Sequence, residues 1–290
     1  MSEAAIPESS APSAAEGKAG RITRRFGKLA AAGELGLIPY LTAGDPSLEA
    51  SEKIVLAAAE AGADIIELGV PFSDPVADGP TIQRASERAL RSGTTLAGVV
   101  ALVEVLRART DVPFVLFSYF NPILQMGLGK FAEAAAAAGA DGVLATDLTP
   151  EEGAEYRDTL RASGLDTIFL AAPTSTQDRL AKIAAFTSGF LYLISRTGVT
   201  GEREALPEDL PALARRARQF TKLPIAVGFG ISQPSHVSRL GGIADAAVVG
   251  SALVAEIEKS ATADAAAASV AERVRLLKRA AREGVSRRSL

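Results

Sequence analysis

Two carboxylates, one inside an apolar segment and one in the loop after it, have the types and spacing of an acid/base pair. Residues 63–70 form an apolar run of the kind that is buried on both faces of a sheet, and Glu67 interrupts it. Burial of an unpaired carboxylate costs several kcal/mol unless it keeps its proton, so we expect Glu67 to have a pKa suited to proton transfer. The following loop is rich in Pro, Gly, Ser and Asp, and Asp78 lies near its end. We therefore interpret Glu67 and Asp78 as a catalytic acid/base pair.

The composition excludes several other kinds of chemistry. The chain has no cysteine and one histidine, His236, which excludes thiolate nucleophiles, disulfides and metal sites built from thiolates or several histidines. We expect no metal, and a structural role for His236 at the start of a helix. The net charge of −3, with acids and bases interspersed, indicates no nucleic-acid partner but is compatible with a small phosphorylated ligand. The lack of cysteine fits a reducing, cytoplasmic environment.

Alternating apolar and alanine-rich segments predict the scaffold that holds these carboxylates. The predicted strands are 37–42, 63–70, 113–118, 142–146, 167–171, 190–194, 224–227 and 246–249. The predicted helices include 48–61, 130–138, 151–163, 176–187 and 207–220. Eight strands, each followed by a helix or a long loop, indicate an α/β fold of the (β/α)₈ TIM-barrel type, with an open doubly wound sheet as the alternative.

Internal repeats favour the closed barrel. The tetrapeptide AGAD occurs at 61–64 and 138–141, and a looser version, GIAD, occurs at 242–245. Each lies between a predicted helix and a predicted strand, which indicates one βα unit used repeatedly.

The amino-terminal residues differ in composition from the rest. We expect a disordered extension over residues 1–20 and a single barrel domain over 21–285, which begins with an extra amphipathic helix at 21–33. No apolar run is long enough for a secretion signal or a membrane span, so we expect no membrane association.

In such a barrel the functional residues lie at the carboxyl ends of the strands. Asp45, Tyr119 and Asp147 follow predicted strands, but each has a structural alternative: the aspartates can cap helices and the tyrosine can pack at the rim. Phe117 and Leu144 are candidates for an apolar pocket wall, although core packing explains them equally well.

Two glycine-rich segments and one polar loop complete the predicted site. Gly228, Phe229 and Gly230 follow the seventh strand, and Gly250 and Ser251 follow the eighth. Glycines allow backbone amides to approach an anion, and a helix amino terminus attracts negative charge, so these segments predict a phosphate site. The loop 195–206 is polar and glycine-rich, as expected of a mobile lid, with a solvated connection as the alternative.

Several motifs occur in an order that is characteristic of one family. They are PYLTAGDP, ELGVPFSDPVADGP, YFNPIL, YLISRTGVTG, VGFGIS and VVGSA. Together they resemble the α subunit of tryptophan synthase over residues 23–277; the first twenty residues have no counterpart. The resemblance implies a carbon–carbon lyase of tryptophan biosynthesis that cleaves indole-3-glycerol phosphate, by a retro-aldol reaction, to indole and glyceraldehyde 3-phosphate. It also implies a pyridoxal-phosphate-dependent β subunit that receives indole in an α₂β₂ complex, and no cofactor in this chain.

The resemblance also implies roles for individual residues. Glu67 and Asp78 match the two catalytic carboxylates of the family. Residues that match the mobile loop, a site-lining tyrosine, and the phosphate and ring contacts are Thr200, Gly201, Tyr192, Gly228, Phe229, Gly230, Gly250 and Ser251. Tyr40 lines the pocket where some members carry Phe, so the pocket details stay open. The alternatives are another phosphate-binding barrel enzyme, a non-catalytic activator of a β subunit, and a stand-alone lyase that releases indole.

Overall fold

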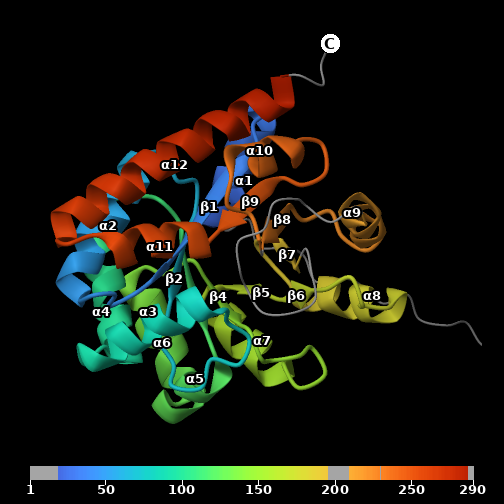
Figure 1. Cartoon of the computed structure of the whole chain (residues 1–290). Helices are drawn as coiled ribbons and strands as arrows, with labels where there is room; N and C mark the ends of the chain where they lie inside the picture. Colours follow the sequence, from blue (N-terminus) through green and yellow to red (C-terminus); the bar gives the residue numbers. More distant parts are fainter. Residues whose placement is uncertain (1–18, 195–208, 229, 287–290) are drawn as a thin grey trace, which may run out of the picture.

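A parallel sheet that closes on itself forms the centre of the molecule (Figure 1). The computed structural model describes residues 19–194, 209–228 and 230–286, with side chains as far as residue 283. Its strands are β1 (Gly36–Thr42), β2 (Ile66–Gly69), β3 (Phe114–Ser118), β4 (Gly142–Ala145), β5 (Asp166–Ile168), β6 (Leu170–Ala171), β7 (Leu191–Ile194), β8 (Ile225–Gly228) and β9 (Ala246–Val249). The order is β5-β4-β3-β2-β1-β9-β8-β7-β6. Only Phe169 separates β5 from β6, so the two edges of the sheet belong to one chain segment and the barrel is closed.

This arrangement confirms the predicted barrel and modifies its fifth strand. The predicted strand 167–171 is divided at Phe169, with β5 pairing to β4 and β6 pairing to β7. The predicted strand 63–70 is also shorter, because only Ile66–Gly69 takes strand geometry. The open doubly wound sheet is therefore wrong.

Helices pack around the barrel, and the first of them covers its amino-terminal end (Figure 1). They are α1 (Arg21–Ala32), α2 (Leu48–Glu60), α3 (Pro80–Arg91), α4 (Leu96–Arg107), α5 (Phe120–Met126), α6 (Leu128–Ala138), α7 (Ala154–Ala162), α8 (Gln177–Phe186), α9 (Leu210–Arg218), α10 (Pro234–Arg239), α11 (Ser251–Lys259) and α12 (Ala263–Ser286). The long helix α12 packs along α2, α10 and α11. In the described part of the chain, no single helix is long and apolar enough to cross a membrane, and only the pair α3 and α4, bent by 93°, meets the length and composition criteria jointly.

Helix α1 is the predicted extra amino-terminal helix, and it packs against the barrel interior. Ile22, Phe26 and Leu29 recur at helical spacing and are buried, and they join the cluster that fills the barrel. The rings of Phe26 and Phe190 lie 5.8 Å apart. The helix ends at Gly33, whose positive φ of 62° provides a left-handed cap. Of the predicted extension 1–20, residues 1–18 lie outside the described residues.

The repeated tetrapeptides join neighbouring strands at the amino-terminal end of the barrel. Each ends in an aspartate that precedes one strand and accepts a backbone N–H from the start of the adjacent strand. The pairs are Asp64 with Leu37 at 2.6 Å, Asp141 with Phe114 at 2.8 Å, and Asp245 with Ile225 at 2.7 Å. Basic side chains neutralise all three carboxylates: Arg25 and Lys278, Arg21 and Arg107, and Arg218, respectively. Because they lie at the end of the barrel opposite to the strand carboxyl ends, these aspartates serve the fold.

Candidate active site

Glu67 points into the barrel from the middle of β2. Its side chain is 0% exposed, and neither carboxylate oxygen has a hydrogen-bond partner among the described residues. Its neighbours in the sheet are Tyr40 on β1 and Val115 on β3. Burial raises the pKa of Glu67 to about 8, so the carboxyl group is mainly protonated at neutral pH. This is the physical condition for a proton donor.

Asp78 lies in the loop after β2 and is held by Tyr119. The Tyr119 hydroxyl donates a hydrogen bond of 3.1 Å to Oδ2 of Asp78 and accepts one of 2.9 Å from the N–H of Ala77. The ring of Phe72 stacks on that of Tyr119 at 4.9 Å between centroids. Burial raises the pKa of Asp78 to about 6, while the hydrogen bond from Tyr119 lowers it. Asp78 is more buried than its polar loop suggests, yet it is mainly ionised at neutral pH.

Two buried tyrosines lie within electrostatic range of both carboxylates. The pKa of Tyr192 is raised well above its usual value by burial first, and then by the charges of Glu67, Tyr40 and Asp78. The pKa of Tyr40 is likewise raised by burial and by the charges of Asp78 and Glu67. The structure therefore brings together four predicted site residues that lie up to 152 positions apart, Tyr40 and Tyr192 being the most distant.

Glycines at the ends of three strands leave room for these tyrosine rings. A Cβ added at Gly228 would lie 2.0 Å from the Tyr192 hydroxyl, and one at Gly69 would lie 2.1 Å from the Tyr40 hydroxyl. At Gly250 it would lie 3.3 Å from Cδ1 of Tyr40. From the sequence, Gly228 and Gly250 were predicted to take part in phosphate and ring contacts, and Gly69 was not singled out. The feature of the sequence that could have indicated Gly69 is a glycine at the end of a strand whose other residues are bulky.

Phe117 and Leu144 form part of the apolar surface beside the carboxylates. Strand register places Phe117 between Gly69 and Leu144, and the side chains of Phe117 and Leu144 belong to the cluster inside the barrel. The ring of Tyr40 meets that of Phe117 edge to face, with centroids 5.2 Å apart. An aromatic ligand at the strand carboxyl ends would contact these side chains.

Gly230, Gly250 and Ser251 lie at the ends of β8 and β9. Gly230 has a positive φ of 82°, which favours glycine, and Gly250 directly precedes α11, whose first residue is Ser251. The first amides of α11 have no acceptor within the helix and are available for an anion. Thr200, Gly201 and Phe229, as well as the predicted lid 195–206, lie outside the described residues.

The remaining polar candidates have structural partners. Asp45 binds Arg88 through both carboxylate oxygens at 2.8 Å, and Ser47 caps α2 in its place. Asp147 accepts the N–H of Phe120 at 2.7 Å, so it caps the start of α5 instead of the helix that follows it. His236 is buried on α10 and accepts the N–H of Ser232 at 3.4 Å through Nδ1. Asp147 and His236 thus have structural roles, whereas the predicted helix cap at Asp45 is wrong because Asp45 forms an ion pair with Arg88.

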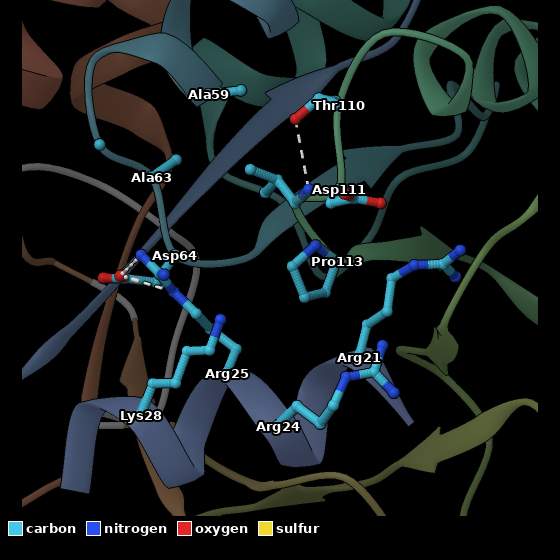
Figure 2. Close-up of a pocket in the computed structure, with 12 residues that line it drawn as sticks. Arg21, Arg24, Arg25, Lys28, Ala59, Ala63, Asp64, Thr110, Asp111 and Pro113 are labelled. Atoms are coloured by element: carbon cyan, nitrogen blue, oxygen red, sulfur yellow. Dashed lines mark hydrogen bonds and ion pairs between the residues drawn. The ribbon is translucent and has the colours of Figure 1, made fainter. Parts of the chain in front are cut away.

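A cavity of about 530 Å³ lies at the opposite end of the barrel (Figure 2). Basic side chains of α1 line one side, and the other side is formed by residues around Asp64 and Asp111. Arg25 is bound to Asp64 there, which is one of the aspartates that join neighbouring strands. The cavity contains neither Glu67 nor Asp78 and is not the candidate active site. Among the described residues, no group of three His, Cys, Asp or Glu side chains could hold a metal ion.

The fold and the site together define a class of protein. A closed parallel barrel carries two buried carboxyl groups, Glu67 on β2 and Asp78 in the loop after it, with pKa values of about 8 and about 6. Glycines and a helix amino terminus lie at the same end of the barrel. These features define a (β/α)₈ barrel whose strand carboxyl ends carry two carboxyl groups with raised pKa values, the arrangement typical of a barrel enzyme.

Comparison with known proteins identifies the family. Residues 26–282 match the family model described as tryptophan synthase alpha chain. The chain is 51% identical to the tryptophan synthase alpha chain of Solibacter usitatus over 259 residues, covering 89% of this chain and 97% of the relative. It is 53% identical to that of Citrifermentans bemidjiense over 239 residues, covering 82% and 90%. The solved structure of Mycobacterium tuberculosis tryptophan synthase matches with a TM-score of 0.85 and 36% identity, covering 91% of this chain and 99% of that one.

The chain belongs to the tryptophan synthase alpha chain family. The role of this family is to cleave indole-3-glycerol phosphate to indole and glyceraldehyde 3-phosphate for the beta subunit. The predicted family and lyase function are therefore confirmed.

Proposed function

We propose that Glu67 and Asp78 carry out this cleavage as a coupled acid and base. The observation that supports the proposal is the separation of their pKa values, about 8 and about 6, within one barrel. At neutral pH Glu67 holds a proton and Asp78 holds a negative charge. Two carboxyl groups in these opposite states can give and take protons on the same substrate without any other group.

The first step converts the indole ring to its indolenine tautomer. Protonated Glu67 donates its proton to C3 of the ring, while ionised Asp78 accepts the proton from the ring N–H. Because Tyr119 donates a hydrogen bond to Asp78, the carboxylate is oriented by a second residue before the substrate binds.

The second step breaks the carbon–carbon bond. Glu67, now ionised, takes the proton from the hydroxyl on the side-chain carbon attached to C3, and that carbon becomes the aldehyde of glyceraldehyde 3-phosphate. The bonding electrons return to the ring, and Asp78 returns its proton to the ring nitrogen to give indole. Both carboxyl groups end in their starting protonation states, so the cycle is balanced.

The remaining predicted residues bind the two ends of the substrate. Tyr40, Phe117, Leu144 and Tyr192 contribute apolar surface for the indole ring, and Tyr119 positions Asp78. The phosphate binds at the first turn of α11, to Gly250 and Ser251, together with Gly228 at the end of β8 and Gly230 beyond it. Thr200, Gly201 and Phe229 complete this set by family resemblance.

The reaction as written requires nothing beyond this chain and its substrate. Proton transfer alone accounts for the reaction, so this chain needs no cofactor. Pyridoxal phosphate belongs to the beta subunit, which receives indole in an α₂β₂ complex in the cytoplasm. Membership of the alpha chain family supports the beta-subunit partner.

The direct test is an assay of the purified chain with indole-3-glycerol phosphate against a panel of other sugar phosphates. The proposal predicts indole release from indole-3-glycerol phosphate only, and a higher rate after addition of a beta subunit. Turnover of a different sugar phosphate would replace it with another phosphate-binding barrel activity. If the chain by itself gives no turnover but activates a beta subunit, it is a non-catalytic partner instead. Full activity without any binding to a beta subunit in a pull-down would identify a stand-alone lyase.

A further inference from the structure

Arg88 of α3 binds two other elements at once. Its Nε and Nη2 atoms donate to Oδ1 and Oδ2 of Asp45, in the loop after β1, each at 2.8 Å. Its Nη1 donates to Oε1 of Glu258 on α11 at 2.9 Å. Arg84, one turn earlier, adds a two-point contact to Glu258 at 2.6 and 2.8 Å. One arginine thus joins the β1 loop, α3 and α11 into a single unit, which we call the Arg88 bridge (Asp45, Arg84, Arg88 and Glu258).

The joined elements carry the two ends of the proposed substrate site. Helix α3 begins at Pro80, two residues after Asp78, the proposed base for the indole nitrogen. Helix α11 begins at Ser251, directly after Gly250, at the proposed phosphate end. The two helices pack side by side (Figure 1), so the bridge lies between the segments that lead to each end.

The contacts of the Arg88 bridge are sheltered from water and hold a defined geometry. The side chain of Asp45 is 0% exposed and that of Arg88 is 24% exposed, so water competes little for their contacts. A guanidinium bound at two points to a carboxylate fixes orientation as well as distance, which an ammonium does not. The Arg91–Glu87 pair on the same helix is different, because both side chains are largely exposed and share a single side-chain contact, which is 3.4 Å long.

We propose that Arg88 is a positioning residue that holds the phosphate end and the carboxylate end of the site at the separation required by the substrate. The inference rests on the proposed function, because it needs a ligand that occupies both ends at once. A ligand with two linked parts gains affinity and reactivity only when both subsites are held in the matching geometry. Arg88 touches neither part of the ligand and acts through α3 and α11.

The test compares the whole substrate with its two halves. For the Arg88→Met variant, binding of glycerol 3-phosphate and of indole is measured separately, alongside kcat and KM for indole-3-glycerol phosphate. The expected result is that each half binds within about twofold of the wild type while kcat/KM for the whole substrate falls by about tenfold or more. The Arg88→Lys variant keeps the charge without the two-point contact, so its kcat/KM for the whole substrate should lie between those of the wild type and of Arg88→Met. Arg91→Met, on the same helix, is the matched control and should leave kcat/KM unchanged.

A second variant distinguishes an effect on the site from loss of the fold. Because Arg88→Met leaves the buried Asp45 without its cation, Glu258→Gln is measured in parallel; it weakens only the contact to α11 and should give the same pattern to a smaller degree. A lower melting temperature with unchanged kcat/KM, or equal weakening of both halves and of the whole substrate, would overturn the proposal. Cleavage of indole-3-glycerol phosphate by the wild type tests the proposed function by itself. The ratio of kcat/KM between variant and wild type tests the Arg88 bridge.

Discussion

The hydroxyl of Tyr119 donates a hydrogen bond of 3.1 Å to Oδ2 of Asp78 and accepts one of 2.9 Å from the backbone of Ala77. The tyrosine therefore joins the proposed base to its own loop. Because this hydrogen bond favours the ionised carboxylate, it opposes the effect of burial on the pKa of Asp78.

Replacement of Tyr119 by Phe should shift the acid limb of the activity profile. Without the hydrogen bond, the pKa of Asp78 rises further above its usual value, and less of the carboxylate is ionised below neutral pH. We expect kcat/KM at pH 6 to fall about tenfold more than at pH 8, which corresponds to the low end, about 1.5 kcal/mol, of a hydrogen bond to a charged group. A pH profile of kcat/KM measures this shift. An equal loss at both pH values would show that Tyr119 acts on something other than ionisation of Asp78.

Gly228→Ala should lower the free energy of unfolding, because the added methyl group would collide with Tyr192. The added Cβ would lie 2.0 Å from the tyrosine hydroxyl, so the ring or the strand has to move. We expect a loss of about 1–3 kcal/mol in the free energy of unfolding, as for overpacked cores, measured by chemical denaturation. Combination with Tyr192→Phe should reduce that loss, since the nearest atom is removed. Gly129→Ala is the control, because a Cβ there meets nothing within 4 Å; an equal cost at both glycines would contradict the steric explanation.

Burial of Glu67 should make the protein less stable as the pH rises. Its pKa is about 8 in the folded protein against 4.5 for an exposed glutamate, so the folded state binds more protons between these values. The free energy of unfolding therefore decreases from about pH 4.5 to pH 8, and Asp78 contributes in the same direction up to about pH 6. Each pKa unit corresponds to about 1.4 kcal/mol, so the total effect is several kcal/mol.

Denaturation curves of wild type and Glu67→Gln at several pH values measure this effect. The variant should lose most of the decrease between pH 6 and pH 8, while Glu133→Gln, on the exposed face of α6, should behave like the wild type. Parallel curves for wild type and Glu67→Gln would mean that Glu67 is not protonated in the folded protein at neutral pH.

The sequence predicted the parts of the site that follow from local pattern. Glu67 was found because a single acid interrupts an apolar strand, and Gly250 because a glycine opens a helix. The repeats ending at Asp64 and Asp141 were visible, but their hydrogen bonds to the preceding strand depend on which strands lie side by side in the sheet.

Features that depend on distant packing could not be predicted. Gly69 is explained by the ring of Tyr40 on the neighbouring strand, and the partner of Asp45 is Arg88, on a helix 43 positions later. Spacing in the sequence gives no indication of either contact. The division of the fifth strand at Phe169 could not be predicted either, because β5 pairs with β4 and β6 pairs with β7 on the other side of the barrel.

The central claim is that Glu67 is the group that moves protons between indole C3 and the side-chain hydroxyl. Glu67→Gln keeps the size of the side chain but cannot exchange a proton. Cleavage of indole-3-glycerol phosphate is measured together with binding of the same substrate, and the claim predicts a fall in kcat of at least about 10²-fold, as for loss of a general acid/base group, with binding within a few-fold of the wild type. A variant that binds the substrate and cleaves it at a near-normal rate would contradict the account.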